Sequence, residues 1–323
     1  MNHPVVVLAG GLSHERDVSL RSGRRAAEAL RDALSSSGVE VVEHDVDAGL
    51  LATLSAEQPS CVLPMLHGES GEDGAIREVL DLLGVPYVGA GPAACRTAFD
   101  KPVAKSVVSR VGISSPESVC LPHETFRELG AADVMAAVVA RLGLPLVVKP
   151  ARGGSALGCS LVTTSEQLPD AMVNAFAYGP VALIERFVAG TEVAVPVVDD
   201  GTGPRALPVV AIKADGGIYD YTARYTAGST EFAVPAPLPA EVLEECARVA
   251  VAAHEALGLR ELSRSDLIVR DDGTVSFLEV NVAPGFTETS LVPISVDAAG
   301  LDLGEVLASL VRAASARDVR ASR

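Results

Sequence analysis

The chain of 323 residues is long enough for two or three domains with separate hydrophobic cores. Apolar residues make up 48% of it and charged residues 21%, which is typical of a globular protein and excludes an intrinsically disordered one. The net charge of −16 and the isoelectric point near 4.8 argue against nucleic acid or an anionic membrane as a partner, because an acidic surface repels polyanions.

Cysteine usage and the N-terminus bear on the compartment. The five cysteines are odd in number, widely spaced and without a CxxC pair, so we expect reduced thiols rather than a disulfide framework or a zinc site. The N-terminal MNHPVVVLAGG lacks the basic start and the length of a signal peptide, and no apolar stretch approaches the ~20 residues of a membrane span. These features predict a cytoplasmic protein.

The predicted elements begin with a strand, a glycine turn and a helix. PVVVLA (4–9) is typical of a buried parallel strand, and apolar residues at helical spacing follow it from 15 to 34. A strand at 61–66, the glycine-rich loop HGESGEDG and the helix AIREVLDLLG, capped by Gly84, complete a first α/β unit near residue 91.

Further strands and helices follow along the chain. Strands are predicted at 144–149, 181–187 and 193–198, and helices at 100–111, 240–257 and 303–314. The segment 200–217 is rich in Gly, Asp and Pro and is predicted to be a hairpin loop, and 219–235 a long ordered loop.

The stretch DLIVRDDGTVSFLEVN has two apolar runs around Asp272-Gly273, which predicts a hairpin with a two-residue turn. In that register Asp266 faces Glu279, with Cβ atoms ~4.5–5.5 Å apart, and Asn281 shares their face. Two carboxylates this close repel each other. Mg²⁺ removes the repulsion because it binds carboxylate and amide oxygens together with phosphate oxygens.

Taken singly, these and other polar residues also have structural interpretations. The hairpin carboxylates fit a solvated strand end, with Arg264 on the same face as their neutralising partner. The loop ARGGSALG (151–158) offers backbone N–H groups to phosphates, but neither it nor LAGGLSHE matches a standard phosphate or dinucleotide motif. Ser155 lies outside GxSxG, which disfavours a covalent hydrolase. Lys101 and Lys149 also fit surface lysines, and Glu185 and Glu192 fit charges on edge strands. A structural role is equally open for His67.

In chain order, the motifs resemble the D-alanine–D-alanine ligase family of the ATP-grasp superfamily, over essentially the whole chain. AGGLSHERDVSLRSG is similar to the family's substrate loop and helix, LHGESGEDG to its HGxxGEDG, FDK to its adenine-side lysine motif, and VVKPARGGSALG to its phosphate-covering loop. IERFVAGTE resembles the adenine and ribose hinge, YDYTARY the lid, and SRSDLIV with FLEVNVAPGFTETSLVP the metal and acceptor segment.

The resemblance implies an α/β fold of three-domain ATP-grasp architecture. An N-terminal open parallel sheet domain would span 1–91, a central ATP-grasp lid domain 92–184, and a C-terminal domain with the metal and acceptor sites 185–323. It implies a homodimer, and ATP with two Mg²⁺ ions, which Mn²⁺ can replace, as the cofactors.

The implied reaction is an ADP-forming ligation. ATP phosphorylates the carboxylate of one D-alanine, and the amine of a second attacks the acyl phosphate, which gives D-alanyl-D-alanine for peptidoglycan synthesis. One alternative is an ATP-grasp amide or cyclising ligase acting on a different amino acid in specialised metabolism. Another is a nucleotide-binding protein that has lost catalysis, against which the retention of the hairpin carboxylates, Asn281 and Arg264 argues.

The resemblance also implies roles for single residues. Glu15 would hold the ammonium of the first D-alanine, with Ser19 one helical turn on, and His67 would lie near its carboxylate. Arg264 and the backbone N–H of Gly285 would stabilise the oxyanion of the tetrahedral intermediate. The implied metal ligands are Asp266, Glu279 and Asn281, and the implied acceptor-carboxylate site is Ser290 with Leu291.

Two further sets of residues would close the site and hold ATP. Ser155 and Tyr225 would form a latch with Glu15 over the site, because an acyl phosphate must be kept from water. In the family a tyrosine at the position of Tyr225 goes with an amine acceptor. The nucleotide set comprises Lys101, Lys149, Arg224 and Ser155 around the phosphates, Glu185, Phe187 and Val188 at the adenine, and Glu192 on the ribose. The chain departs from the family pattern at Gly153, Ala156, Ala211, Thr222, Arg224 and Val282.

Overall fold

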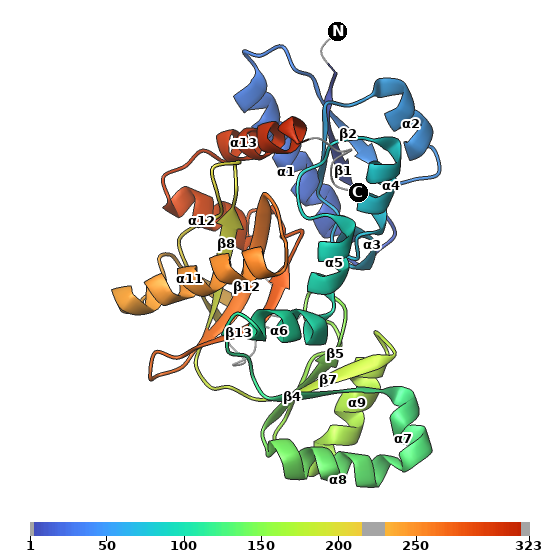
Figure 1. The fold of residues 1–323 in the computed structure, drawn as a ribbon, viewed down its shortest axis with the longest axis vertical. Helices are drawn as coiled ribbons and strands as arrows, with labels where there is room; N and C mark the ends of the chain where they lie inside the picture. The colour runs from blue at the N-terminus through green and yellow to red at the C-terminus, as the bar shows by residue number, and fades with distance from the viewer. Residues whose placement is uncertain (1–2, 215–229, 318–323) are drawn as a thin grey trace.

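The computed structural model describes residues 3–214 and 230–317. Three β-sheets follow one another along the long axis of the molecule, the N-terminal one at the top of Figure 1 and the one built from residues 118–186 at the bottom. The expected α/β architecture with an N-terminal parallel sheet is confirmed. None of the helices in the described ranges combines the length and the apolar character that crossing a bilayer requires.

The N-terminal sheet is parallel and has the strand order β2-β1-β3. The predicted first strand and helix and the Gly84 cap, with φ +68°, are confirmed. β2 was not predicted, because its sequence VVEHD mixes apolar and charged residues and most of it is only half-buried. The elements of this unit are β1 (Val5–Ala9), α1 (Arg16–Leu34), β2 (Val41–Asp45), α2 (Leu50–Glu57), β3 (Cys61–Pro64), α3 (Glu69–Glu72) and α4 (Ala75–Leu83).

A second sheet is antiparallel, with the order β4-β7-β5-β6; we call it the four-stranded sheet. The helices on it bury a separate apolar cluster that includes Leu142, Leu168 and Met172. Its elements are β4 (Ser118–Pro122), α7 (His123–Leu129), α8 (Ala131–Leu142), β5 (Leu146–Pro150), β6 (Ser160–Val162), the 3₁₀ turn Ser165–Gln167, α9 (Leu168–Phe176) and β7 (Val181–Arg186).

The third, six-stranded sheet is also antiparallel, in the order β11-β10-β8-β12-β13, with β9 paired to β8. The predicted hairpin loop over 200–217 is wrong, because the whole of β9 and β10 lies within it and both strands pair with β8. Its elements are β8 (Thr191–Val198), β9 (Arg205–Ala206), β10 (Val210–Ala214), β11 (Thr230–Ala233), α11 (Ala240–Ala256), β12 (Leu262–Val269), β13 (Val275–Asn281), α12 (Leu291–Ala298) and α13 (Leu303–Ala316).

Two segments pack away from their neighbours in sequence. The helices α5 (Pro92–Phe99) and α6 (Lys101–Ser109) bury Cys95, Ala104 and Val108 in the core of the six-stranded sheet. The last helix, α13, lies beside α1 and shares its apolar cluster (Figure 1). Domain boundaries at 91 and 184 stay a prediction, and the strands of the four-stranded sheet run from Ser118 to Arg186.

Candidate active site

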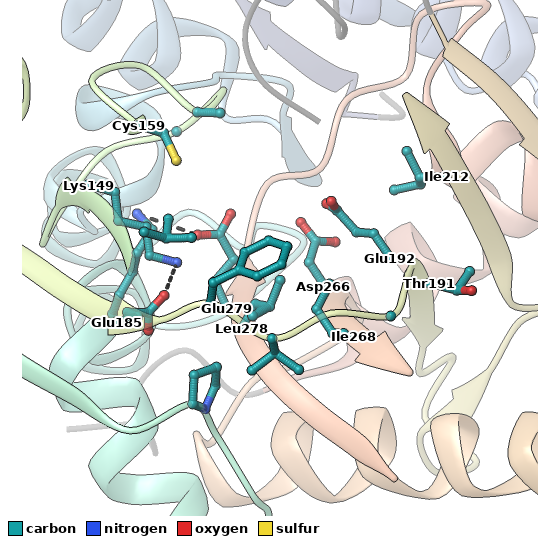
Figure 2. Close-up of a pocket in the computed structure, with 18 of the residues that line it drawn as sticks. Lys149, Cys159, Glu185, Thr191, Glu192, Ile212, Asp266, Ile268, Leu278 and Glu279 are labelled. Atoms are coloured by element: carbon teal, nitrogen blue, oxygen red, sulfur yellow. Dashed lines mark ion pairs between the residues drawn. The ribbon is translucent and has the colours of Figure 1, made fainter. Parts of the chain in front are cut away.

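A cavity of about 570 Å³ opens between the four-stranded and six-stranded sheets, a size typical of ligand sites. One wall comes from β5, β7 and the loop after β5, and the other from β8, β10, β11, β12 and β13. Figure 2 shows Lys149 and Glu185 on the first wall, and Asp266 and Glu192 on the second, with Glu279 between them. The cavity therefore brings together charged residues from distant parts of the chain.

The hairpin pairing of Asp266 with Glu279 across β12 and β13 is confirmed. The predicted two-residue turn is wrong, since the backbone N–H of Arg270 donates to the carbonyl of Thr274 at 3.0 Å and leaves three residues in the loop. The last of these, Gly273, has φ +82°, which fits the common three-residue loop with a left-handed glycine.

A β-bulge restores the register that the longer turn would have shifted. Leu267 pairs with Phe277 and Asp266 with Glu279, so Leu278 is the extra residue. Phe277 is buried in the core, whereas Leu278 and Glu279 both line the cavity (Figure 2). Strand alternation would have turned one of these two consecutive residues away, and the bulge removes that restriction.

Asp266 is neutralised by the arginine two residues before it. The Nε and Nη2 atoms of Arg264 donate to the two carboxylate oxygens of Asp266 at 2.7 and 2.8 Å, and both residues are buried. Through this bidentate contact Arg264 neutralises the Asp266 carboxylate, as its place on the same strand face suggested. The oxyanion role of Arg264 stays a prediction.

The three predicted metal ligands are only partly gathered at the cavity. Asp266 and Glu279 line it, while Asn281 is outside the described lining and accepts a hydrogen bond from the N–H of Ala283 at 2.8 Å. Over the described ranges there is no group of three or more His, Cys, Asp and Glu side chains arranged for a metal ion. Two facing carboxylates that line a cavity, with an amide two residues after Glu279 on the same strand, are nevertheless a donor set that suits Mg²⁺.

The predicted lysines reach the cavity and contact its carboxylates. Lys149 Nζ lies 2.7 Å from Glu185 Oε2, and Lys101 Nζ lies 3.6 Å from Glu279 Oε2. Burial lowers the pKa of Lys149. Lys105, which sequence reasoning missed, forms a second ion pair with Glu185, whose side chain is only 3% exposed. Its spacing of four residues from Lys101 on α6 was the available signal.

The loop after β5 has a backbone suited to covering the cavity. The carbonyl of Gly153 accepts a hydrogen bond from Lys101 Nζ at 2.6 Å. Gly153 has φ +124°, which L side chains rarely adopt, and this accounts for a glycine where the family carries an acid. Ser155 and Ala156 are left-handed too, with φ +51° and +54°.

This loop touches the N-terminal unit through Glu15. The hydroxyl of Ser155 donates to Glu15 Oε1, and a Cβ atom at Gly154 would lie 3.1 Å from Glu15 Oε2. Glu15 is 9% exposed, and neither it nor Ser155 is part of the described cavity lining, which includes the neighbouring Gly154 and Ala156. Ser19 is fully buried, where it accepts from the N–H of Gly10 and donates to the carbonyl of Met65, at 2.8 and 2.6 Å.

His67 bridges the N-terminal unit and the loop after β13. Its Nδ1 lies 2.9 Å from the carbonyl oxygen of Ala283, and its Nε2 2.9 Å from the hydroxyl of Ser22. The N–H of Phe286 donates to the same hydroxyl at 3.0 Å. The consistent assignment is a neutral ring, with Nδ1–H donating to Ala283 and Ser22 O–H donating to Nε2. Burial lowers the pKa of His67, which favours this form.

The loop that His67 holds leads into the predicted acceptor segment. Ser290 Oγ accepts from the N–H of Thr287 at 2.9 Å, lies 2.9 Å from its hydroxyl, and would lie 2.8 Å from a Cβ atom at Gly285. Leu291 is buried and contributes to a small cluster on β8 and β10. A side chain at residue 285 would therefore have to displace the Ser290 hydroxyl, and the role of these residues in acceptor binding stays a prediction.

One buried carboxyl near this junction has no role in the sequence prediction. Glu72 accepts from the N–H of Gly68 at 2.9 Å. Burial, reinforced by the charge of Glu15, raises the pKa of Glu72 to about 8. Its position in HGESGEDG is the signal that pointed to this loop.

The adenine and ribose candidates also line the cavity. Phe187, Val188 and Glu192 belong to its wall, and so does Ala211, one of the departures from the family pattern. Thr222, Arg224 and Tyr225 lie outside the described residues, and their roles stay predictions.

Two antiparallel sheets that enclose a cavity, with Lys149 on one wall, the hairpin carboxylates on the other and Lys101 beside Glu279, define an ATP-grasp enzyme. The family models "D-ala D-ala ligase C-terminus" and "D-ala D-ala ligase N-terminus" match residues 107–312 and 39–90. The chain belongs to the D-alanine–D-alanine ligase family.

Similar proteins cover nearly the whole chain. A D-alanine–D-alanine ligase of Desulforudis audaxviator is 41% identical over 315 residues, which are 96% of this chain and 98% of that protein. A crystal structure of D-alanine–D-alanine ligase from Bacillus anthracis complexed with ATP aligns with a TM-score of 0.80 at 28% identity, over 99% of this chain and 100% of that one. The VanG D-Ala:D-Ser ligase from Enterococcus faecalis aligns with a TM-score of 0.81 at 27% identity, over 96% and 99%.

Proposed function

We propose that the protein joins two D-alanine molecules with ATP, through a D-alanyl phosphate, to give D-alanyl-D-alanine for peptidoglycan synthesis. The observation that carries this proposal is the convergence of Lys101, Lys149, Asp266 and Glu279 on one cavity, with Glu15 hydrogen-bonded to the loop after β5 that lines it. The names of the relatives and the ATP complex of a similar ligase support the same activity.

Charged side chains would bind the first D-alanine and assist the transfer of the phosphoryl group to it. The Glu15 carboxylate attracts the ammonium of the first D-alanine and directs its carboxylate toward the cavity. Lys101 and Lys149 stabilise the charge that develops on the transferred phosphoryl group, because they are cations held close to it in a partly desolvated site. The contact of Ser155 with Glu15 keeps water from the acyl phosphate, which would otherwise hydrolyse.

The acceptor side uses the hairpin end and the loop after it. The amine of the second D-alanine attacks the acyl carbon, and the tetrahedral oxyanion is stabilised by Arg264 with the N–H of Gly285. The second carboxylate binds at Ser290 and the start of α12, where the N–H groups of Leu291 and Val292 have no acceptor within the helix. Phosphate leaves as the peptide bond forms.

Asp266, Glu279 and Asn281 would hold Mg²⁺, which neutralises the phosphate oxygens of ATP. The matched test is Glu279→Gln, which keeps the shape of the side chain and removes its charge. We expect at least a hundredfold loss of turnover with an unchanged circular dichroism spectrum. Turnover within about threefold of the wild type would refute the metal role.

The activity itself is tested by phosphate release from ATP and Mg²⁺ across D- and L-amino acids. We expect release with D-alanine alone, and a dipeptide as the product. D-serine belongs in the series, because one similar structure is a D-Ala:D-Ser ligase. Turnover with another amino acid and none with D-alanine would overturn the assignment.

Assembly and compartment complete the proposal. We expect a homodimer in the cytoplasm, where ATP and the precursors of the cell wall are available. Sedimentation equilibrium tests the first expectation and fractionation of the source cells the second. A monomer at micromolar concentration, or a secreted protein, would contradict them.

A further inference from the structure

Lys105 occupies an unusual place for a lysine. It lies on α6 with 6% exposure and contacts Glu185 Oε1, while Lys149 Nζ contacts the other oxygen of the same carboxylate at 2.7 Å. The chain has four lysines, and three of them, Lys101, Lys105 and Lys149, lie around this end of the cavity. Two ammonium groups therefore share one buried carboxylate.

The two lysines on Glu185 differ in their access to the cavity. Lys149 and Glu185 line it (Figure 2), whereas Lys105 is not part of its lining as the structure describes it. Lys105 therefore lies behind Glu185, on the side away from the cavity. Burial, followed by the charge of Lys149, lowers the pKa of Lys105 well below its ordinary value, whereas the contact with the Glu185 carboxylate favours the ammonium form that a counterion requires.

This arrangement has a consequence when phosphates enter the cavity. A polyphosphate attracts the Lys149 ammonium away from Glu185, because Lys149 is the member of the pair that faces the ligand. A buried carboxylate that loses its partner costs several kcal/mol, which would be subtracted from the binding energy. Among the described residues, Lys105 is the cation that still contacts Glu185 after Lys149 has moved.

We propose that Lys105 is a positioning residue of the nucleotide site: it is the permanent counterion of Glu185, and it frees Lys149 to bind phosphate. Glu185 then stays ionised and keeps a lone pair for a donor in the cavity, such as an adenine amino group. The inference rests on the proposed function, because it requires a nucleotide in the cavity.

The test compares ADP with adenosine by titration calorimetry on wild type and Lys105→Met. In the variant Lys149 is the only partner of Glu185, so it must leave the carboxylate unpaired in order to bind phosphate. We expect ADP to bind at least about tenfold more weakly, and adenosine, which needs no movement of Lys149, to stay within about twofold. Equal weakening of both ligands, or no change in either, would overturn the proposal.

Two further variants separate this role from a general effect on folding. In a Glu185→Gln background no carboxylate is left unpaired, so adding Lys105→Met should change ADP affinity by less than about twofold. A tenfold loss there would sink the proposal, even if the single variant does not fold. The exposed Arg110→Met at the end of the same helix controls for the lost cation and should bind both ligands normally. Failure of the wild type to bind ADP would instead refute the proposed function.

Discussion

Ser22→Ala removes a single hydroxyl that joins two units of the protein. This oxygen accepts from the N–H of Phe286 at 3.0 Å and lies 2.9 Å from Nε2 of His67, and Ser22 is fully buried. Alanine leaves both of these partners unsatisfied and too deep for water to reach. Each unsatisfied buried group costs about 1–3 kcal/mol, so we expect the free energy of unfolding to fall by roughly 2–5 kcal/mol.

The assay is urea unfolding followed by circular dichroism, with Ser276→Ala as the matched control. Ser276 is 1% exposed, and its hydroxyl has no hydrogen-bond partner among the residues that the structure describes. Its loss leaves no partner unsatisfied and removes an unsatisfied hydroxyl, so the free energy of unfolding should fall by no more than about 0.5 kcal/mol. If Ser22→Ala and Ser276→Ala differ by less than that amount, the bridge through His67 does not hold the two units together as argued here.

Three further predictions follow. Burial raises the pKa of Glu72 to about 8, so the folded state keeps a proton that the unfolded chain releases near pH 4.5, and stability falls as the pH rises between these values. Urea midpoints from pH 5 to 8 should lose this slope in Glu72→Gln and retain it in Glu69→Gln, the exposed neighbour on α3. Burial lowers the pKa of His254 from 6.5 to about 4, so stability is lost as the pH falls across that window, by about 3 kcal/mol in total; His254→Gln should flatten this acid limb, and an unaltered limb would rule the residue out. Ser155→Ala breaks the contact with Glu15 and should raise the phosphate released per dipeptide formed several-fold, whereas an unchanged ratio would show that the contact does not exclude water.

Local patterns in the sequence were sufficient for many of the elements. The run of apolar residues in β1, the helical spacing in α1 and α11 and the glycine cap after α4 each depend on residues a few positions apart. β9 and β10 could not be found in this way, because they are strands only by virtue of pairing with β8.

The hairpin shows how a correct strand pair can be predicted from an incorrect turn. The pairing of Asp266 with Glu279 was predicted from a two-residue loop, yet the loop has three residues and a bulge at Leu278 compensates for it. The sum of the two shifts is zero, which is why the prediction of the pair survived.

The sequence by itself determined the family, the order of its motifs and the residue types at the cavity, since these are properties of short segments. The tertiary structure alone decided that Lys105 contacts Glu185, 80 positions later, and that Ser22 contacts His67 and Phe286. It also placed Glu72 where burial holds its proton. Burial and long-range partners determine the charge and hydrogen bonding of these groups, and neither can be deduced from the neighbours of a residue in the chain.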